Sequence, residues 1–124
     1  MKLIHLCKSK IHSAVVTGAD VYYEGSIGID LDLMRRSGIA AGERVCVWNR
    51  NTGARIETYA IPLSEHSGEI IINGAAARLF YPGDHVIIAA YCLTDERIIP
   101  LMVLVDAKNR FVRELTAPAS TALC

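Results

Sequence analysis

The sequence carries no excess of charge of either sign, because Lys and Arg together number 13 and so do Asp and Glu. A protein that binds the phosphate backbone of nucleic acid depends on a basic excess, so we expect no nucleic-acid partner. Long apolar runs are also missing. The charge-free stretches of the C-terminal half, 86–94 and 98–105, are far shorter than the roughly 20 residues of a spanning helix. The second is interrupted by Pro100, so we expect no membrane segment.

The sequence also lacks a secretory signal and paired cysteines. The apolar stretch from Leu3 to Cys7 is too short for a signal peptide and is followed by Lys8 and Lys10. None of the four cysteines has the C-x-x-C spacing: they are Cys7, Cys46, Cys92 and Cys124. We therefore expect reduced, mostly buried thiols and a cytoplasmic location.

Several common catalytic signatures are missing as well. The chain has no Gly-rich phosphate loop, no His-Glu-x-x-His motif and no nucleophile elbow. His5 and Cys7 would share one face of a strand, but two ligands do not make a metal site, so no metal is expected. His66 and His85 stand beside turns, where we expect them at the surface.

What the chain does have is apolar residues. The hydrophobic set makes up 52% of the 124 residues, and the mean hydropathy is +0.28. This length suits a single domain over residues 1–124, with one core and no need of disulfides. The excess apolar surface predicts a subunit interface, and a net charge near zero does not oppose association.

The apolar residues are mainly β-branched, with 23 Ile and Val against 14 Leu and Met. This composition favours strands. The predicted strands, separated by turn signals such as Asn51-Thr52-Gly53, are 13–17, 27–30, 44–49, 54–61, 69–72, 85–92 and 100–105. We expect a small, mainly β barrel.

Two short helices fit between these strands. Asp30 is a candidate N-cap for a helix over 31–37, which would end at Gly38. Asn73 is a candidate N-cap for a second helix over 75–79. The tail, 116–124, is rich in small residues and is expected to be loose.

Three segments could carry chemistry. Lys10 and His12 would share one face of an extended segment, as a basic site or as a solvated edge. Gly25 before Ser26 permits a strained turn in which the hydroxyl faces the preceding carbonyl, although a Gly-Ser pair is common by chance. The helix that follows Asn73 would present free amides that bind a carboxylate, unless it is only a capped helix.

Taken together, these segments resemble the pyruvoyl-dependent aspartate 1-decarboxylases of pantothenate biosynthesis. The matching strings, in order, are Leu6-Cys7-Lys8-Ser9-Lys10-Ile11-His12, Tyr23-Glu24-Gly25-Ser26, Ile29-Asp30, Asn51-Thr52-Gly53-Ala54-Arg55, Glu57-Thr58-Tyr59-Ala60-Ile61, Asn73-Gly74-Ala75-Ala76-Ala77 and Gly83-Asp84-His85-Val86-Ile87-Ile88. They span residues 1 to about 105, which is most of the chain, and the match weakens after Tyr91. The resemblance implies a six-stranded double-psi β-barrel with short helices that assembles as a homotetramer.

The resemblance also implies self-processing. In that family the serine hydroxyl attacks the carbonyl of the preceding glycine, and the resulting ester is eliminated and hydrolysed. On this sequence the bond that breaks is Gly25–Ser26. The products are a β chain of residues 1–25 and an α chain of residues 26–124. Ser26 becomes a covalent pyruvoyl group, which is the implied cofactor.

Roles for residues around this bond are implied in the same way. Thr58 supports the processing intermediate and contacts the substrate. Tyr23 and Asn73 line the same site, and Tyr59 donates a proton to the carbanion. In a regular strand Arg55 and Tyr59 share a face and Thr58 lies opposite, so a bulge, a strand end or a site shared between subunits must bring them together.

The implied reaction converts L-aspartate to β-alanine and CO2. The pyruvoyl group from Ser26 forms a Schiff base with the substrate amine and accepts the electrons left by CO2. Arg55 grips one carboxylate with its planar fork, and Lys10, with His12 near it, supplies a second cation. The neutral donors are the amides of Gly74, Ala75 and Ala76.

Two alternatives stay open. The chain could be an uncleaved double-psi barrel that acts as a binding module without catalysis, or a pyruvoyl decarboxylase for another acidic amino acid. Whether maturation needs a partner protein leaves no mark in the sequence. A denaturing gel, which detects cleavage before Ser26, separates the enzyme from the binding module.

Overall fold

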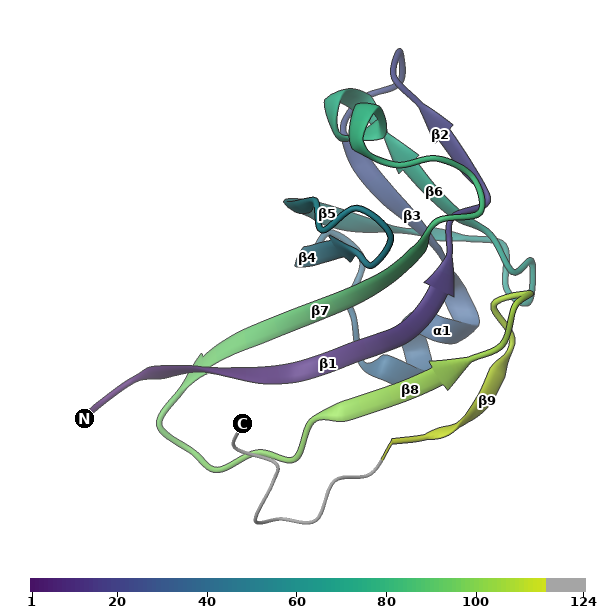
Figure 1. The fold of residues 1–124 in the computed structure, drawn as a ribbon. Helices are drawn as coiled ribbons and strands as arrows, with labels where there is room; N and C mark the ends of the chain where they lie inside the picture. Colours follow the sequence, from purple (N-terminus) through teal and green to yellow (C-terminus); the bar gives the residue numbers. More distant parts are fainter. Residues whose placement is uncertain (116–124) are drawn as a thin grey trace.

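The computed structural model describes residues 1–115 (Figure 1). The mainly β class expected from the sequence is confirmed. The strands are β1 (Ile4–Val15), β2 (Gly18–Asp20), β3 (Ser26–Asp30), β4 (Arg44–Asn49), β5 (Arg55–Leu63), β6 (Ile70–Asn73), β7 (His85–Thr94), β8 (Leu101–Val105) and β9 (Phe111–Glu114). The helices are α1 (Leu31–Ser37) and the 3₁₀ helix η1 (Gly74–Leu79). The expectation for the tail, 116–124, lies outside the described residues.

All nine strands join one sheet in the order β2-β6-β3-β5-β4-β7-β1-β8-β9. This exceeds the six barrel strands implied by the resemblance, because the sheet also takes in the three-residue β2 and the β8–β9 hairpin at its edges. The sheet curls back on itself just beyond β1, where the Thr17 amide donates to the Ile70 carbonyl of β6 at 2.8 Å. Among residues 1–115, no helix has the length and apolar character needed to cross a membrane.

The predicted strand 13–17 is wrong, because β1 begins nine residues earlier and ends at Val15. Its pairing with β7 shifts register twice, between Cys7 and Ser9 and between Ile11 and Ala14. Ser13, inside the second shift, has a φ of +66°. These bulges break the period-2 alternation from which a strand is read in a sequence. Beyond the barrel, β1 and β7 continue as a projecting two-stranded ribbon (Figure 1).

The core is built from the β-branched residues that dominate the composition. Ile11, Ile27, Ile29, Val47, Ile72 and Ile88 are all fully buried. They occupy the inward face of their strands, and the residues between them point outward. At the end of β3, the Asp30 side chain accepts the Asp32 amide and caps α1, which ends at Gly38 with a φ of +74°, both as expected.

Candidate active site

The Gly25–Ser26 bond lies where an exposed loop enters the sheet. Gly25 is exposed, whereas Ser26, the first residue of β3, is 2% exposed. Ser26 pairs directly with Asn73 of β6, whose Nδ2 donates to the Ser26 Oγ at 3.0 Å. Asn73 therefore makes no side-chain cap for η1, which corrects the expected capping role. The Asn73 side-chain amide is instead hydrogen-bonded to Ser26, whose hydroxyl the expected self-processing reaction needs.

Gly74 packs against the backbone of Gly25, on the other side of this bond from Ser26. Its φ is +79°, and a Cβ built on it would lie 2.7 Å from the Gly25 Cα and 3.3 Å from the Tyr23 carbonyl oxygen. Only glycine tolerates both this backbone conformation and this approach. The sequence indicated Gly74 as an amide donor and gave no sign that it packs against Gly25, because that contact joins segments about 50 residues apart.

The register of β3 on β5 brings two more predicted residues to the bond. These strands are parallel, with Ile27 beside Ala60. Gly25 and Ser26 come directly before this pair on one side, and Thr58 and Tyr59 come directly before it on the other. The two residues point to opposite faces of β5, and Thr58 lies on the core side, cross-strand from the buried Val45. Because β5 begins before the start of its pairing with β3, this arrangement agrees with the strand-end explanation.

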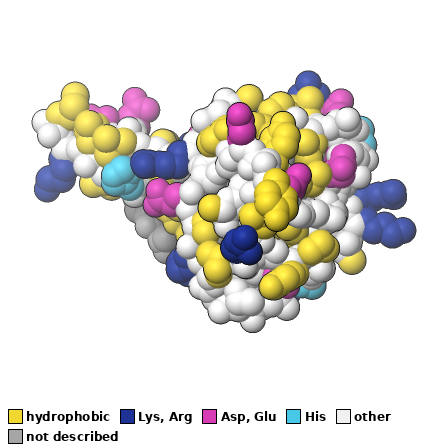
Figure 2. Space-filling model, turned by 90° about the horizontal axis from the view of Figure 1, so that it is seen from above, with side chains coloured by type: hydrophobic (Ala, Val, Ile, Leu, Met, Phe, Trp, Pro, Cys, Tyr) yellow, Lys and Arg dark blue, Asp and Glu magenta, His cyan; other side chains and the backbone are white. Residues whose placement is uncertain are grey.

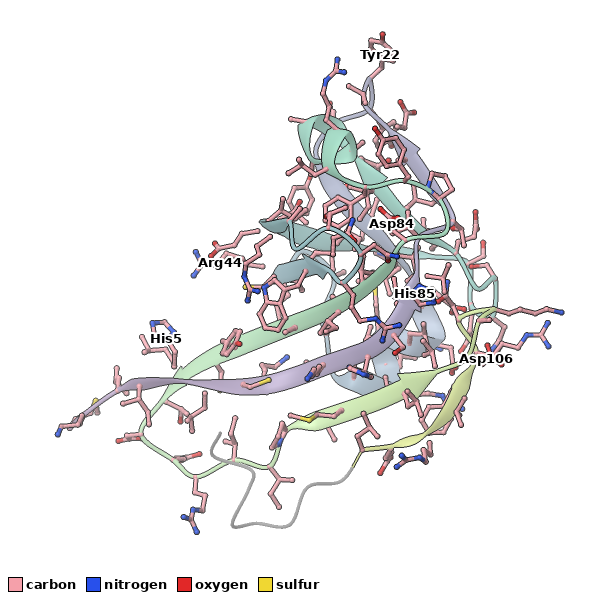
Figure 3. The ribbon with its side chains drawn as sticks, viewed as in Figure 1. His5, Tyr22, Arg44, Asp84, His85 and Asp106 are labelled. Carbon is pink, nitrogen blue, oxygen red and sulfur yellow. The ribbon has the colours of Figure 1, made fainter. Side chains whose placement is uncertain are left out.

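Three tyrosines around this bond are exposed in the single chain. Tyr22 is 97% exposed at the tip of the loop before β3, where it points away from the body of the molecule (Figure 3). Tyr23 is 58% exposed and Tyr59 is 43% exposed. Aromatic side chains of this size gain the most from burial. Their exposure leaves an aromatic surface beside a nearly buried serine.

Arg55 is four residues before Tyr59 on the same outward face of β5. Its guanidinium lies 4.6 Å from the ring centroid of Trp48, its cross-strand neighbour, so it is held by a cation–π contact. Pairing between β4 and β5 runs from Arg55 to Tyr59 without a register shift. Arg55 is therefore placed about 13 Å along the strand from Tyr59.

Lys10 and His12 do not join this group within one chain. They flank the fully buried Ile11 and so point outward from β1. In the strand order β5, β4 and β7 lie between β3 and β1. Ala75 and Ala76 follow Gly74 in η1, where Ala75 is exposed and Ala76 is half-buried.

The titratable side chains elsewhere correct two expectations. Cys7, Cys46 and Cys92 are half-buried rather than buried. Burial, followed by the nearby Glu57 carboxylate, raises the pKa of the Cys46 thiol. His66 is exposed as expected, whereas His85 is half-buried.

A groove of about 680 Å³ lies on the outward face of β4, β7 and β1, and its lining residues are His5, Glu43, Arg44, Cys46, Glu57, Ala89, Tyr91 and Leu93. His5 and Arg44 stand at its two sides in Figure 3. Apolar side chains gather on the projecting part at the left of Figure 2. The exposed apolar residues of the ribbon include Ile4 of β1 and Leu93 of β7. Groove and ribbon together form an outward surface that one chain leaves uncovered.

Comparison with known proteins gives one consistent answer. A family model described as aspartate decarboxylase matches residues 1–112. An aspartate 1-decarboxylase of Chloroherpeton thalassium is 53% identical over 114 residues, which cover 89% of this chain and 83% of the relative. The enzyme of the same name in Myxococcus xanthus is 50% identical, covering 86% and 85%. That of Leptospira biflexa is 49% identical, covering 87% and 96%.

Proposed function

The chain belongs to the aspartate decarboxylase family, and from that premise we propose that it is an aspartate 1-decarboxylase. It converts L-aspartate to β-alanine and CO2, and the β-alanine serves pantothenate synthesis. The observation that carries the proposal is the hydrogen bond from Asn73 to the Ser26 hydroxyl beside the Gly25–Ser26 bond. Reaction in the cytoplasm agrees with the scattered spacing of the cysteines.

The chain prepares its own site by breaking the Gly25–Ser26 bond. The Ser26 Oγ attacks the Gly25 carbonyl, so that an ester forms and the amide C–N bond breaks. Elimination releases residues 1–25 with a C-terminal carboxylate, and water then replaces the Ser26 nitrogen, which leaves as ammonia. Asn73 orients the hydroxyl by its 3.0 Å hydrogen bond. Thr58, which lies two residues before the first β3–β5 pair, stabilises the carbonyl oxygen of the intermediate.

The residues present fit a pyruvoyl group at position 26. Gly74 leaves the space that a Cβ would fill beside Gly25, and Gly25 is exposed, so the bond can open without disturbing the core. A carbonyl of this kind supplies an electron sink for the carbanion that remains when CO2 leaves. Around it, this chain holds the substrate, excludes water and supplies a proton.

The charged residues recognise the two carboxylates of aspartate. Arg55, held on Trp48, and Lys10 bind the side-chain carboxylate that is retained. A strong ion pair on the leaving carboxylate would stabilise the ground state and slow the reaction. Tyr59, beside Ser26, donates the proton to the carbanion. The first amides of η1, at Gly74, Ala75 and Ala76, have no acceptor within the helix and orient the other carboxylate.

The complete site requires more than one copy of the chain. We propose that a neighbouring protomer supplies Lys10, because β1 and β3 are not adjacent in the strand order. The exposed tyrosines and the uncovered groove and ribbon agree with a homotetramer in which these surfaces are buried. In that assembly the aromatic side chains also shield the reacting centre from water.

A denaturing gel with intact-mass measurement tests this function. The purified protein should give two fragments, 1–25 and 26–124, and the larger should lack a free α-amine. Ser26→Ala should stay intact and form no β-alanine from L-aspartate, whereas Ser67→Ala, at an exposed turn, should cleave normally. A single intact chain that remains intact on warming and still binds a ligand would favour the uncleaved binding module. Cleavage with turnover of another acidic amino acid would assign a different substrate.

A further inference from the structure

Arg50, which follows β4, has no role in the function described so far. It is fixed at two points: its amide donates to the His85 carbonyl at 2.8 Å, and its Nη1 donates to the Ser13 Oγ at 3.2 Å. Ser13 lies in the β1 bulge directly after His12 and has a φ of +66°. The bulge therefore turns the Ser13 hydroxyl toward Arg50. The hydrogen bond to Ser13 holds the Arg50 guanidinium near the Lys10–His12 pair. His85, whose carbonyl accepts the Arg50 amide, is labelled in Figure 3 and shows where this group lies.

His12 has an unusual environment for a half-buried imidazole. Its Nδ1 is inaccessible to solvent and has no hydrogen-bond partner within residues 1–115. A proton on Nδ1 would be buried without an acceptor, which costs free energy. The favoured form is therefore the neutral ring with its proton on Nε2, which leaves an N–H donor on the more open side.

The burial of His12 and the charges around it also favour the neutral imidazole. Burial lowers the pKa of His12 from its ordinary value, and the positive charges of Lys10 and Arg50 lower it further. The neighbouring strands add no charge of their own here, because β8 places Leu104 beside His12 and β7 places Ile88 beside Ile11. Within residues 1–115, neither Lys10 nor Arg50 forms an ion pair with a carboxylate. Their charges therefore act on His12 and on an incoming anion without a local counter-charge.

We propose that Arg50 is a positioning residue of the substrate site: fixed on Ser13 directly after His12, it adds a positive charge that helps to keep the buried imidazole a neutral Nε2–H donor toward the bound carboxylate. The inference rests on the proposed function, which places Lys10 and His12 against the substrate. Arg50 itself need not touch aspartate. It helps to maintain a group of two cations, Lys10 and Arg50, and one neutral donor, His12. The charge that receives the substrate therefore stays constant across the pH range in which a free histidine titrates.

The test is an NMR titration of the imidazole resonances in the full-length, assembled protein, with His12→Gln used to assign the His12 signal. Wild-type His12 should titrate below its ordinary pKa of 6.5. Arg50→Gln should raise the His12 pKa, and Arg50→Lys should restore it. Arg97→Gln removes the same charge from an exposed position that does not act on His12, so it should leave the titration unchanged.

Kinetics give a second readout. Cleavage before Ser26 should proceed normally in Arg50→Gln, but kcat/KM should change between about pH 6 and about pH 8 more steeply than in the wild type. A wild-type His12 that titrates at or above 6.5 overturns the proposal, as does an equal shift in Arg50→Gln and Arg97→Gln. If the protein forms no β-alanine, the proposed function fails. The titration still decides whether Arg50 controls the charge of His12.

Discussion

At the scale of single residues, the geometry around the Gly25–Ser26 bond depends on a position that has no side chain. Gly74 has a φ of +79°, and a Cβ built at this position would lie only 2.7 Å from the Gly25 Cα. Gly42 has a similar φ of +82°, but its Cβ would meet open space. Alanine substitutions at the two glycines therefore distinguish the free-energy cost of the backbone conformation, which both share, from that of the close contact, which only Gly74 has.

Gly74→Ala should therefore be worse than Gly42→Ala in two measurements. Alanine in the left-handed region costs about 1–2 kcal/mol at either position. At Gly74 we expect a further loss of about 1–2 kcal/mol from the contact, visible in urea unfolding. Cleavage before Ser26 should slow in Gly74→Ala alone, because Gly25 has to shift away. Equal cleavage rates in the two variants would remove Gly74 from the processing site.

The role of a residue could be predicted from the sequence where it depends on neighbouring residues in the chain. It could not be predicted where it depends on which strands pair and in what register. A serine after a glycine and an asparagine before a small-residue helix start stand out in the sequence. Their mutual contact does not, because it depends on β3 pairing with β6 across 47 residues. The same limit explains Asn73: local preference indicates a helix cap, but the tertiary contact with Ser26 uses the amide instead.

At the scale of elements, one buried carboxylate joins three segments. Asp30 is 2% exposed, and its two oxygens accept backbone N–H groups from Asp32, His66 and Gly68, each at 2.9 Å. It therefore fixes the end of β3, the first turn of α1 and the turn between β5 and β6. Because β3 begins at Ser26, this connection also anchors the strand that carries the site.

Asp30→Ala should leave three backbone donors without their acceptor and destabilise the protein by about 3 kcal/mol. Asp106→Ala is the matched control, because Asp106 also accepts backbone N–H groups, from Lys108 and Arg110, but is exposed. Those hydrogen bonds, that of Arg110 foremost, lower the pKa of Asp106. Its stabilising effect is therefore present above the unfolded pKa and lost as the pH falls through the folded one. Urea midpoints at neutral pH should show a much larger loss for Asp30→Ala. Equal losses would mean that the buried connection is unimportant.

Elements with clear end signals were predicted well. The bounds of α1 and β4 agree with the structure, because Asp30 and Gly38 limit the helix and the Asn51-Thr52-Gly53 turn limits the strand. The start of β1 was missed, because its polar residues and bulges hide the alternation. The strands β2 and β9 were missed too, since segments of three and four residues give too short a pattern to identify.

At the scale of the whole molecule, the apolar excess divides between a core and an outward surface. The core takes the Ile and Val side chains of the strands. The ribbon of β1 and β7 and the loop before β3 leave large apolar and aromatic groups exposed, among them Ile4, Tyr22 and Leu93. A monomer would expose them to water, whereas the proposed tetramer would bury them and, on the same proposal, would bring Lys10 of one chain near Ser26 of another.

This arrangement predicts complementation between two inactive chains. Lys10→Ala and Ser26→Ala should each have little activity alone. In co-expressed mixtures, some sites combine Ser26 of one chain with Lys10 of its neighbour. With random assembly, about a quarter of all sites should be complete, and β-alanine formation should return to about that fraction of the wild-type rate.

The matched control pairs residues that the β3–β5 register places together in one chain. A mixture of Ser26→Ala and Tyr59→Phe should not recover activity if both residues act within one chain, because every chain that retains Ser26 then carries Phe at position 59. Light scattering should give the mass of four chains for each mixture, and a denaturing gel should show cleavage only of chains that retain Ser26. Recovery in both mixtures would mean that Tyr59 also crosses the interface. Recovery in neither, with tetramers intact, would place Lys10 and Ser26 of the same chain in one site, against the sheet order.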